Sequence, residues 1–284
     1  MSSGPVGFIC GSGRLPIEAA DAAIAAGRAV FLIGLRGAAD PEIERFPHTW
    51  VRLGEVGKLF KALDGAGARE ITLLGGVQRP SIRDLGLDMT GLVAMPELKR
   101  LLSGGDDKLL RGLVTFVESR GYRVIGVHEA APDLLAPEGI FGAHEADAES
   151  AAGVSAAMNV LAALGPFDVG QAAVALGARV VAIEAAEGTD GMLRRVARMV
   201  EKRRLRRDGR GGVLVKLPKP GQDLRIDLPA IGPRTIELAI QAGLSAVAVA
   251  AGGVLIAEKA KVVAMAVEGR LFVAGVPQSA YAAS

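Results

Sequence analysis

Three carboxylates gather around one predicted strand-to-helix turn in the second half of the chain. Glu184 ends an apolar run, and Glu187 and Asp190 follow shortly after it. Carboxylate oxygens are ligands that Mg²⁺ prefers, and the exposed amides of a helix N-terminus attract an anion. Thr189 stands where it would cap that helix. The turn therefore suits a hard cation together with an anionic ligand, or else a capped helix with no chemistry.

A second acidic stretch runs from Lys216 to Pro229. It reads KLPKPGQDLRIDLP and is too polar and too rich in proline for a simple connection. Lys216 lies at its start, and Asp223 and Asp227 lie further along it. Lysines beside carboxylates suit a phosphate held together with a metal ion. The chemistry expected of such a set is displacement at phosphorus, with carboxylates holding Mg²⁺ and orienting water.

Two glycine-rich turns lie in the first half. Gly11 and Gly13 follow an apolar run and precede a predicted helix, so their backbone could approach a phosphate at that helix N-terminus. Pro16 stands where a dinucleotide site has its third glycine, which favours another nucleotide or ligand over NAD. In the second turn, 75–79, Gln78 could bind a base edge and Arg79 could clamp a phosphate, although such residues are also common in plain surface loops.

The other polar features allow a structural reading beside a functional one. Asp106 and Asp107 could bind magnesium or a ribose hydroxyl, or stand at the N-cap of a helix. Residues 194–210 hold nine basic residues, which form either a solvated helix face or a contact with an anionic membrane or acidic partner. Nucleic acid is disfavoured because aromatic residues make up only 4% of the chain. His128 and His144 lack partners at metal-binding spacing.

The elements that position these residues follow from apolar periodicity. The pattern predicts strands at 6–10, 29–33, 70–74, 123–127, 179–184 and 212–216, and helices at 15–27, 56–63, 109–117 and 147–164. A further helix follows Asp190, another ends at Ala242, and several Val/Ala-rich strands finish the chain. Strands alternating with helices predict an α/β fold: a Rossmann-like N-terminal domain with a parallel sheet, then a C-terminal α/β domain with a mixed sheet.

Composition supports two folded domains. The chain has 284 residues, of which 50% are hydrophobic, and its 33 basic and 31 acidic residues nearly balance, so whole-surface binding to a polyanion is excluded. A Pro/Gly-marked joint at 131–139 divides it into domains at 1–136 and 137–284. The single cysteine, Cys10, cannot form an intramolecular disulfide and suits a cytosolic protein. The uncharged run 238–257 is interpreted as helix end, strand, Gly-Gly turn and strand rather than a membrane span.

Taken together and in this order, the motifs resemble the LpxI family, the UDP-2,3-diacylglucosamine pyrophosphatases of lipid A biosynthesis, over nearly the whole chain. The matching segments are 11–16 (GSGRLP), 75–80 (GGVQRP), 105–107 (GDD), 187–190 (EGTD), 212–216 (GVLVK) and 227–232 (DLPAIG). EGTD and DLPxIG are the most specific of them. The resemblance implies a Rossmann-like domain that holds UDP and a C-terminal catalytic and lipid-binding domain.

The resemblance also implies the reaction and its residues. Water attacks the α-phosphorus of UDP-2,3-diacylglucosamine, with Mg²⁺ or Mn²⁺, to give UMP and 2,3-diacylglucosamine 1-phosphate (lipid X). Catalysis is assigned to Asp227, Asp190 and Lys216, and metal binding to Asp227, Asp190 and Glu187. The substrate-binding residues are Gly11, Gly13, Leu15, Gly75, Gly76, Gln78, Arg79, Asp106, Asp107, Thr189, Gln222, Gly232 and Thr235.

Two rival functions remain. An NAD-type oxidoreductase is disfavoured by Pro16 and by Leu35-Arg36-Gly37, which stands where an acidic residue would end the second strand. A non-catalytic protein that binds a nucleotide or a membrane surface through 194–210 is the other. For the enzyme we expect a cytoplasmic homodimer peripheral to the inner membrane, with no nucleic-acid partner.

Overall fold

The computed structural model describes residues 4–77, 86–93, 106–142, 148–205 and 211–277. Their contacts divide the chain into two compact units. Unit 1 comprises 1–133 together with Arg225–Asp227, and unit 2 comprises 134–224 and 228–284. Gln78 and Arg79 fall outside the described residues.

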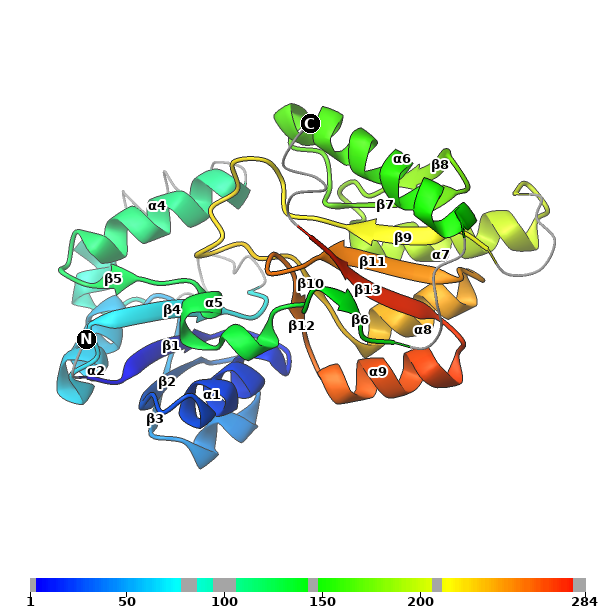
Figure 1. Ribbon diagram of the computed structural model, residues 1–284. Coiled ribbons are helices and arrows are strands. Elements are labelled where there is room, and N and C mark those ends of the chain that lie inside the picture. The colour runs from blue at the N-terminus through cyan, green and yellow to red at the C-terminus, as the bar shows by residue number, and fades with distance from the viewer. Residues whose placement is uncertain (1–3, 78–85, 94–105, 143–147, 206–210, 278–284) are drawn as a thin grey trace. The chain divides into compact units, whose positions relative to one another are not determined.

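Unit 1 is built on a parallel five-stranded sheet with the order β3-β2-β1-β4-β5 (Figure 1). Its elements are β1 (Val6–Cys10), α1 (Leu15–Ala25), β2 (Val30–Leu35), a 3-10 turn (Pro41–Arg45), β3 (His48–Val51), α2 (Val56–Ala66), β4 (Glu70–Leu74), α4 (Asp106–Glu118), β5 (Arg123–Val124), α5 (Val127–Ala130) and a 3-10 turn (Pro132–Leu134). This strand order is that of a doubly wound sheet: successive strands are added on one side of β1 up to β3, and the order then reverses so that β4 and β5 are added on the other side.

Local sequence signals set the helix ends of unit 1. Pro16 lies in the first turn of α1, where its missing N–H costs no hydrogen bond. Gly27, with a φ of 79°, follows the last turn of α1 in the left-handed conformation that glycine adopts without strain. Apolar side chains of α2 and α4, including Phe60, Leu63 and Val117, pack on one face of the sheet. Helices α1 and α5 contact each other and the sheet strands β1 and β4.

Unit 2 contains a mixed six-stranded sheet with the order β6-β13-β11-β9-β7-β8 and a small parallel pair, β10-β12. Its elements are β6 (Gly139–Ile140), α6 (Ala148–Leu164), a 3-10 turn (Gly165–Phe167), β7 (Ala172–Leu176), β8 (Arg179–Ile183), α7 (Gly188–Glu201), β9 (Val213–Lys216), β10 (Ala230–Ile231), α8 (Pro233–Gln241), β11 (Ala246–Ala250), β12 (Leu255–Ile256), α9 (Lys259–Glu268) and β13 (Phe272–Val276). Strand β7 runs antiparallel to both of its neighbours, which makes the sheet mixed.

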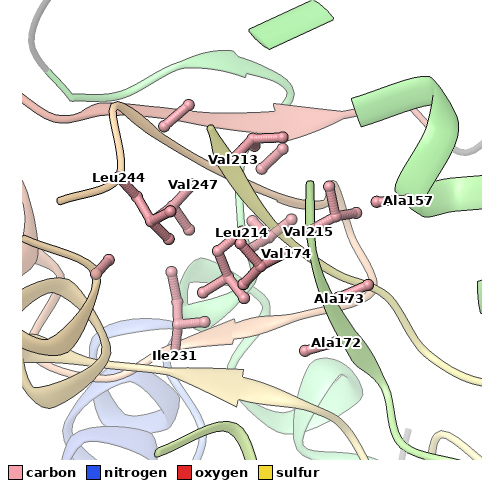
Figure 2. Close-up of a cluster of buried hydrophobic side chains, with 14 of the residues drawn as sticks. Ala157, Ala172, Ala173, Val174, Val213, Leu214, Val215, Ile231, Leu244 and Val247 are labelled. Carbon is pink, nitrogen blue, oxygen red and sulfur yellow. The ribbon is translucent and has the colours of Figure 1, made fainter. Parts of the chain in front are cut away.

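Helices cover both faces of the unit 2 sheet. Figure 1 shows α6 on one face and the row α7, α8, α9 along the other. The core between them consists of small aliphatic side chains, among them Ala172, Val174, Leu214 and Val247 (Figure 2). Such side chains let the sheet and helices approach closely, so the low aromatic content leaves no packing deficit.

The predicted fold class, two α/β parts with a parallel and a mixed sheet, is confirmed, while several predicted boundaries are wrong. Strand β5 ends at Val124, because Gly126 donates its N–H to the Glu129 carboxylate at 3.1 Å and begins α5 where a strand was predicted. Strand β7 was missed, and α9 occupies a region predicted as strands. Both errors concern alanine- and valine-rich segments, whose period alone does not separate strand from buried helix.

The uncharged run 238–257 divides as predicted into the end of α8, strand β11, a turn and strand β12. Among the described residues, one helical stretch, Glu149–Phe167, is long and apolar enough to cross a membrane by length and composition alone. In unit 2 this stretch packs on β7 and β9 and buries Ala157, Met158 and Leu161.

Candidate functional site

The two glycine-rich turns of unit 1, which we call the glycine loops (11–13 and 75–76), meet at the carboxyl edge of the sheet. Cys10 and Leu74 are register partners at the ends of β1 and β4, so the loops leave the sheet side by side. Ser12 and Gly76 form an antiparallel bridge, with N···O distances of 2.8 and 3.2 Å, and the Ser12 hydroxyl donates to the Gly76 carbonyl at 3.0 Å.

The approach of the glycine loops leaves no room for a side chain at Gly11. A Cβ there would lie 2.5 Å from the Gly76 carbonyl oxygen, and one at Gly75 would lie 2.6 Å from the Ser12 carbonyl oxygen. Gly13 differs, because its φ of 96° requires glycine although the space beside it is open. Gly11 and Gly75 are therefore required by the close packing of the two loops against each other, and phosphate binding at the loops stays a prediction.

This edge has the features of a ligand site in an open parallel sheet. It lies at the carboxyl ends of β1 and β4, where the strand order reverses, and α1 begins beside it at Leu15. Both features favour an anionic ligand near the N-terminus of α1. Strand β2 ends at Leu35 and is followed by Arg36, so the acidic residue that binds the ribose in NAD sites is missing here.

Helix α4 begins at Asp106, so Asp106 and Asp107 are its first residues rather than residues ahead of it. Their side chains fall outside the described part of the structure, and their binding role stays a prediction.

In unit 2 the structure brings Lys216, Thr189 and Glu184 together in a chain of hydrogen bonds that we call the polar network. The Lys216 ammonium donates to the Thr189 hydroxyl and to the Ala230 carbonyl, both at 2.9 Å. The Thr189 hydroxyl donates to Glu184 Oε1 at 3.0 Å, and Glu184 Oε2 accepts the Gln171 N–H at 3.2 Å. Lys216 and Thr189 are both buried. A buried lysine ammonium is costly unless it is hydrogen-bonded, and the network supplies two acceptors, with the Glu184 carboxylate beyond the Thr189 hydroxyl.

The prediction that Thr189 caps α7 is wrong. The N-cap is Glu187, whose side chain makes no capping bond, and Thr189 lies inside the first turn of the helix. The Thr189 hydroxyl is already committed to Glu184 and Lys216. Sequence reasoning placed Glu184 in the acidic cluster but missed this contact, for which its position directly after a strand was the only signal.

The other two carboxylates of the turn pair with arginines. Arg195 donates to Glu187 at 2.6 Å. The backbone hydrogen bond within Glu187 and the bond from Arg195 both hold the pKa of this carboxyl below its usual range. Asp190 lies 3.4 Å from Arg194 and 3.8 Å from Arg234. These exposed pairs make the surface of the turn a mixture of charges rather than an acidic patch.

No group of three or more His, Cys, Asp or Glu side chains that could hold a metal ion occurs among the described residues. Mg²⁺ is commonly held by one or two carboxylates together with substrate phosphates and waters. The predicted Mg²⁺ or Mn²⁺ and its ligands Asp227, Asp190 and Glu187 stay a prediction.

The remaining predicted residues have local roles in the fold. Gln222 accepts the Lys219 N–H at 2.8 Å and closes a turn, and Gly232 is the N-cap of α8, where its N–H reaches the Thr235 hydroxyl at 3.4 Å. Asp227 belongs by its contacts to unit 1, in a segment where Ile226 packs on the unit 1 core and Arg225 pairs with Glu118 at 3.1 Å.

Comparisons with known proteins agree on one family. The family model for the LpxI N-terminal domain matches residues 5–134, and that for the LpxI C-terminal domain matches 137–274. The chain is 42% identical over 271 residues to the UDP-2,3-diacylglucosamine pyrophosphatase LpxI of Caulobacter vibrioides. That match covers 95% of this chain and 97% of the relative.

Proposed function

The chain belongs to the LpxI family, and from that premise we propose that it is a UDP-2,3-diacylglucosamine pyrophosphatase of lipid A biosynthesis. The single observation that carries the proposal is the 42% identity to a relative of that activity over nearly the full length of both chains. The proposed reaction is the attack of water on the α-phosphorus. The anhydride bond breaks, UMP leaves with the oxygen from water, and lipid X keeps the bridging oxygen on its phosphate.

We assign the uridine diphosphate part of the substrate to unit 1. The close approach of Gly11 to Gly76 and the start of α1 at Leu15 support a phosphate bound by backbone groups. Gln78 and Arg79, which follow the second glycine loop in sequence, would bind the base and the phosphate, and Asp106 and Asp107 would reach the ribose or a cation. These four assignments rest on residue type and on the family resemblance.

We assign the charge on the reacting phosphate to the polar network of unit 2. Lys216 is a buried cation that is already held in place, and such a group stabilises developing negative charge without first reorganising. Thr189 contacts it, while Gln222, Gly232 and Thr235 would shape the site through the turns that they close. Asp227 is proposed to orient water, with Asp190 as the second catalytic carboxylate.

We propose that hydrolysis requires a divalent cation, Mg²⁺ or Mn²⁺. Asp227, Asp190 and Glu187 are the candidates to hold it together with the substrate phosphates. When bound, the cation would neutralise the pyrophosphate and make its phosphorus easier to attack. Release of Glu187 from Arg195 and of Asp190 from Arg194 would have to accompany this binding.

We propose a cytoplasmic homodimer that binds the inner-membrane surface without crossing it. Support for the membrane contact comes from the end of α7 and the residues after it, where Arg198, Lys202, Arg203 and Arg204 lie close together in sequence. Clustered basic residues attract anionic lipid headgroups, each by about 1 kcal/mol near the surface.

The test uses the purified chain with UDP-2,3-diacylglucosamine in detergent micelles and follows release of UMP and lipid X. We expect turnover that stops in excess chelator and returns on addition of Mg²⁺ or Mn²⁺. In water enriched in oxygen-18, the label should enter UMP and not lipid X. A protein that leaves the substrate intact with either metal would overturn the proposed activity, and label in lipid X would move the attack to the other phosphorus.

A further inference from the structure

The register of the unit 2 sheet places Glu184 and Lys216 on opposite sides of β7 but on one face of the sheet. Ala172, the first residue of β7, is the register partner of Lys216, and Ala173 is the partner of Ile183. Glu184, one residue beyond Ile183, donates its N–H to the Ala172 carbonyl at 2.8 Å. Side chains alternate along a strand, so Glu184, Ala172 and Lys216 all face α7.

Thr189 bridges this span. Strands in a sheet lie about 4.8 Å apart, so the backbones of β8 and β9 are separated by roughly twice that distance across β7. Thr189 lies in the first turn of α7, and its hydroxyl lies between the two side chains. Thr189 Oγ1 is 2.9 Å from Lys216 Nζ and 3.0 Å from Glu184 Oε1. Ala172, which lies below, is small enough to leave room for the bridge.

The direction of the bridge is fixed by the number of protons available. A threonine hydroxyl has one proton to donate, and a lysine ammonium can only donate. The Thr189 proton must therefore point to the Glu184 carboxylate, and the Thr189 lone pairs to Lys216. Glu184 is itself held by the Gln171 N–H at 3.2 Å, so its carboxylate cannot turn away freely.

We infer that Glu184 is a positioning residue, which acts through Thr189 to fix the Lys216 ammonium against the substrate phosphate. The inference rests on the proposed function, in which Lys216 meets that phosphate. Without the carboxylate the Thr189 hydroxyl has no fixed acceptor, so its lone pairs no longer hold the Lys216 ammonium in one place. A displacement of about 1 Å in a catalytic group can lower a rate on the order of 100-fold.

The test is a double-mutant cycle on the full chain, with turnover of UDP-2,3-diacylglucosamine as the readout. Glu184→Gln keeps the shape of the side chain and removes its charge, and Thr189→Val removes the hydroxyl. We expect kcat to fall about 10-fold and about 30-fold respectively, with KM within about twofold of wild type. If Glu184 acts through Thr189, the double variant should stay within about threefold of Thr189→Val.

Two further variants separate positioning from folding. Thr189→Ser keeps the hydroxyl and should stay within about threefold of wild type, which tests the bridge even if Glu184→Gln does not fold. Glu268→Gln, an exposed carboxylate at the end of α9, is the matched control and should leave turnover unchanged.

The outcomes distinguish the inference from the proposed function. Effects of Glu184→Gln and Thr189→Val that multiply, to about 300-fold together, would overturn positioning through Thr189, as would a Thr189→Val variant with wild-type kcat. Lys216→Met is measured in parallel. Wild-type turnover in Lys216→Met would overturn the role of Lys216 in the proposed function and with it the premise of the inference, whereas multiplicative effects beside an inactive Lys216→Met would overturn the inference alone.

Discussion

The carboxyl edge of the unit 1 sheet is formed by backbone atoms, whereas the polar network of unit 2 is formed by side chains. At the carboxyl edge of unit 1, the backbones of the two glycine loops pack directly against each other, and only glycine fits at positions 11 and 75. In the polar network, Lys216, Thr189 and Glu184 act through their functional groups and are held by one another. A backbone site is disturbed by adding atoms, and a side-chain site by removing them.

This difference also predicts how the two regions fail. Adding a Cβ in unit 1 should disturb folding and nucleotide binding together, because the backbone that packs there is the one proposed to bind the nucleotide. Removing a functional group in unit 2 should lower the rate while the fold persists, since the aliphatic core does not depend on it.

The largest effect is expected at Asp227. Asp227→Ala removes the carboxylate proposed to orient water or hold the cation, and should lower kcat on the order of 10²- to 10⁴-fold. UDP affinity, measured by calorimetry, should change little. Asp21→Ala, which removes an exposed carboxylate paired with Arg45, is the control and should retain turnover. Near-normal kcat in Asp227→Ala would move the catalytic assignment to Asp190.

Lys216→Met comes next. The change keeps a similar volume and removes the buried charge, so kcat should fall on the order of 10²-fold, while the unfolding free energy should fall by only about 1–3 kcal/mol, because the Ala230 carbonyl and the Thr189 hydroxyl lose the lysine donor. The control is Lys261→Met, because Lys261 is an exposed lysine on α9 paired with Glu258. Steady-state kinetics and a urea titration give both quantities. A large loss of stability with little loss of rate would make the polar network a structural feature and erase the contrast between the two regions.

Gly11→Ala should disturb unit 1 in both respects. The new Cβ meets the Gly76 carbonyl at 2.5 Å, so either the loop or the strand must move, at a cost of about 1–3 kcal/mol. UDP affinity should fall with it. Gly27→Ala supplies the comparison, since an alanine at this position would be strained by the φ of 79° but would meet open space, at the other end of α1 from the glycine loops. That variant should lose stability without losing UDP affinity. Unchanged UDP binding in Gly11→Ala would exclude the glycine loops as the nucleotide site.

The smallest effect on turnover and UDP binding concerns Cys10, at the end of β1, whose chemistry is predicted to bear on neither. Burial raises the pKa of the Cys10 thiol to about 12. At pH 8.5 the folded chain should therefore react with iodoacetamide far more slowly than the chain in guanidinium, on the order of 10³-fold by thiolate fraction. The raised pKa also means that the contribution of this thiol to stability is complete below about pH 9, the unfolded value, and is lost as the pH rises toward 12. Intact mass follows the alkylation, and rapid labelling of native protein would show that β1 opens.

Much of the fold follows from local patterns. Val6–Cys10 and Glu70–Leu74 are strands at the predicted residues, because their length of five residues and the glycines that follow them favour a strand over a buried helix. Pro16 and Gly27 bound α1 for reasons contained in their own backbone chemistry. The predictions failed at β7 and α9, where an alanine- and valine-rich run is compatible with either element, and at the end of β5, where Gly126 begins α5.

The candidate sites divide in the same way. Glycine pairs and clustered acidic residues can be recognised in the sequence alone, so the glycine loops and the turn at 184–190 are predicted from residue type and spacing. Their partners are not. The bridge from Ser12 to Gly76, the bond from Lys216 to Thr189, and the grouping of Asp227 with unit 1 join residues far apart in the chain. Strand order and register decide such contacts, and these depend on how whole elements pack rather than on any one segment.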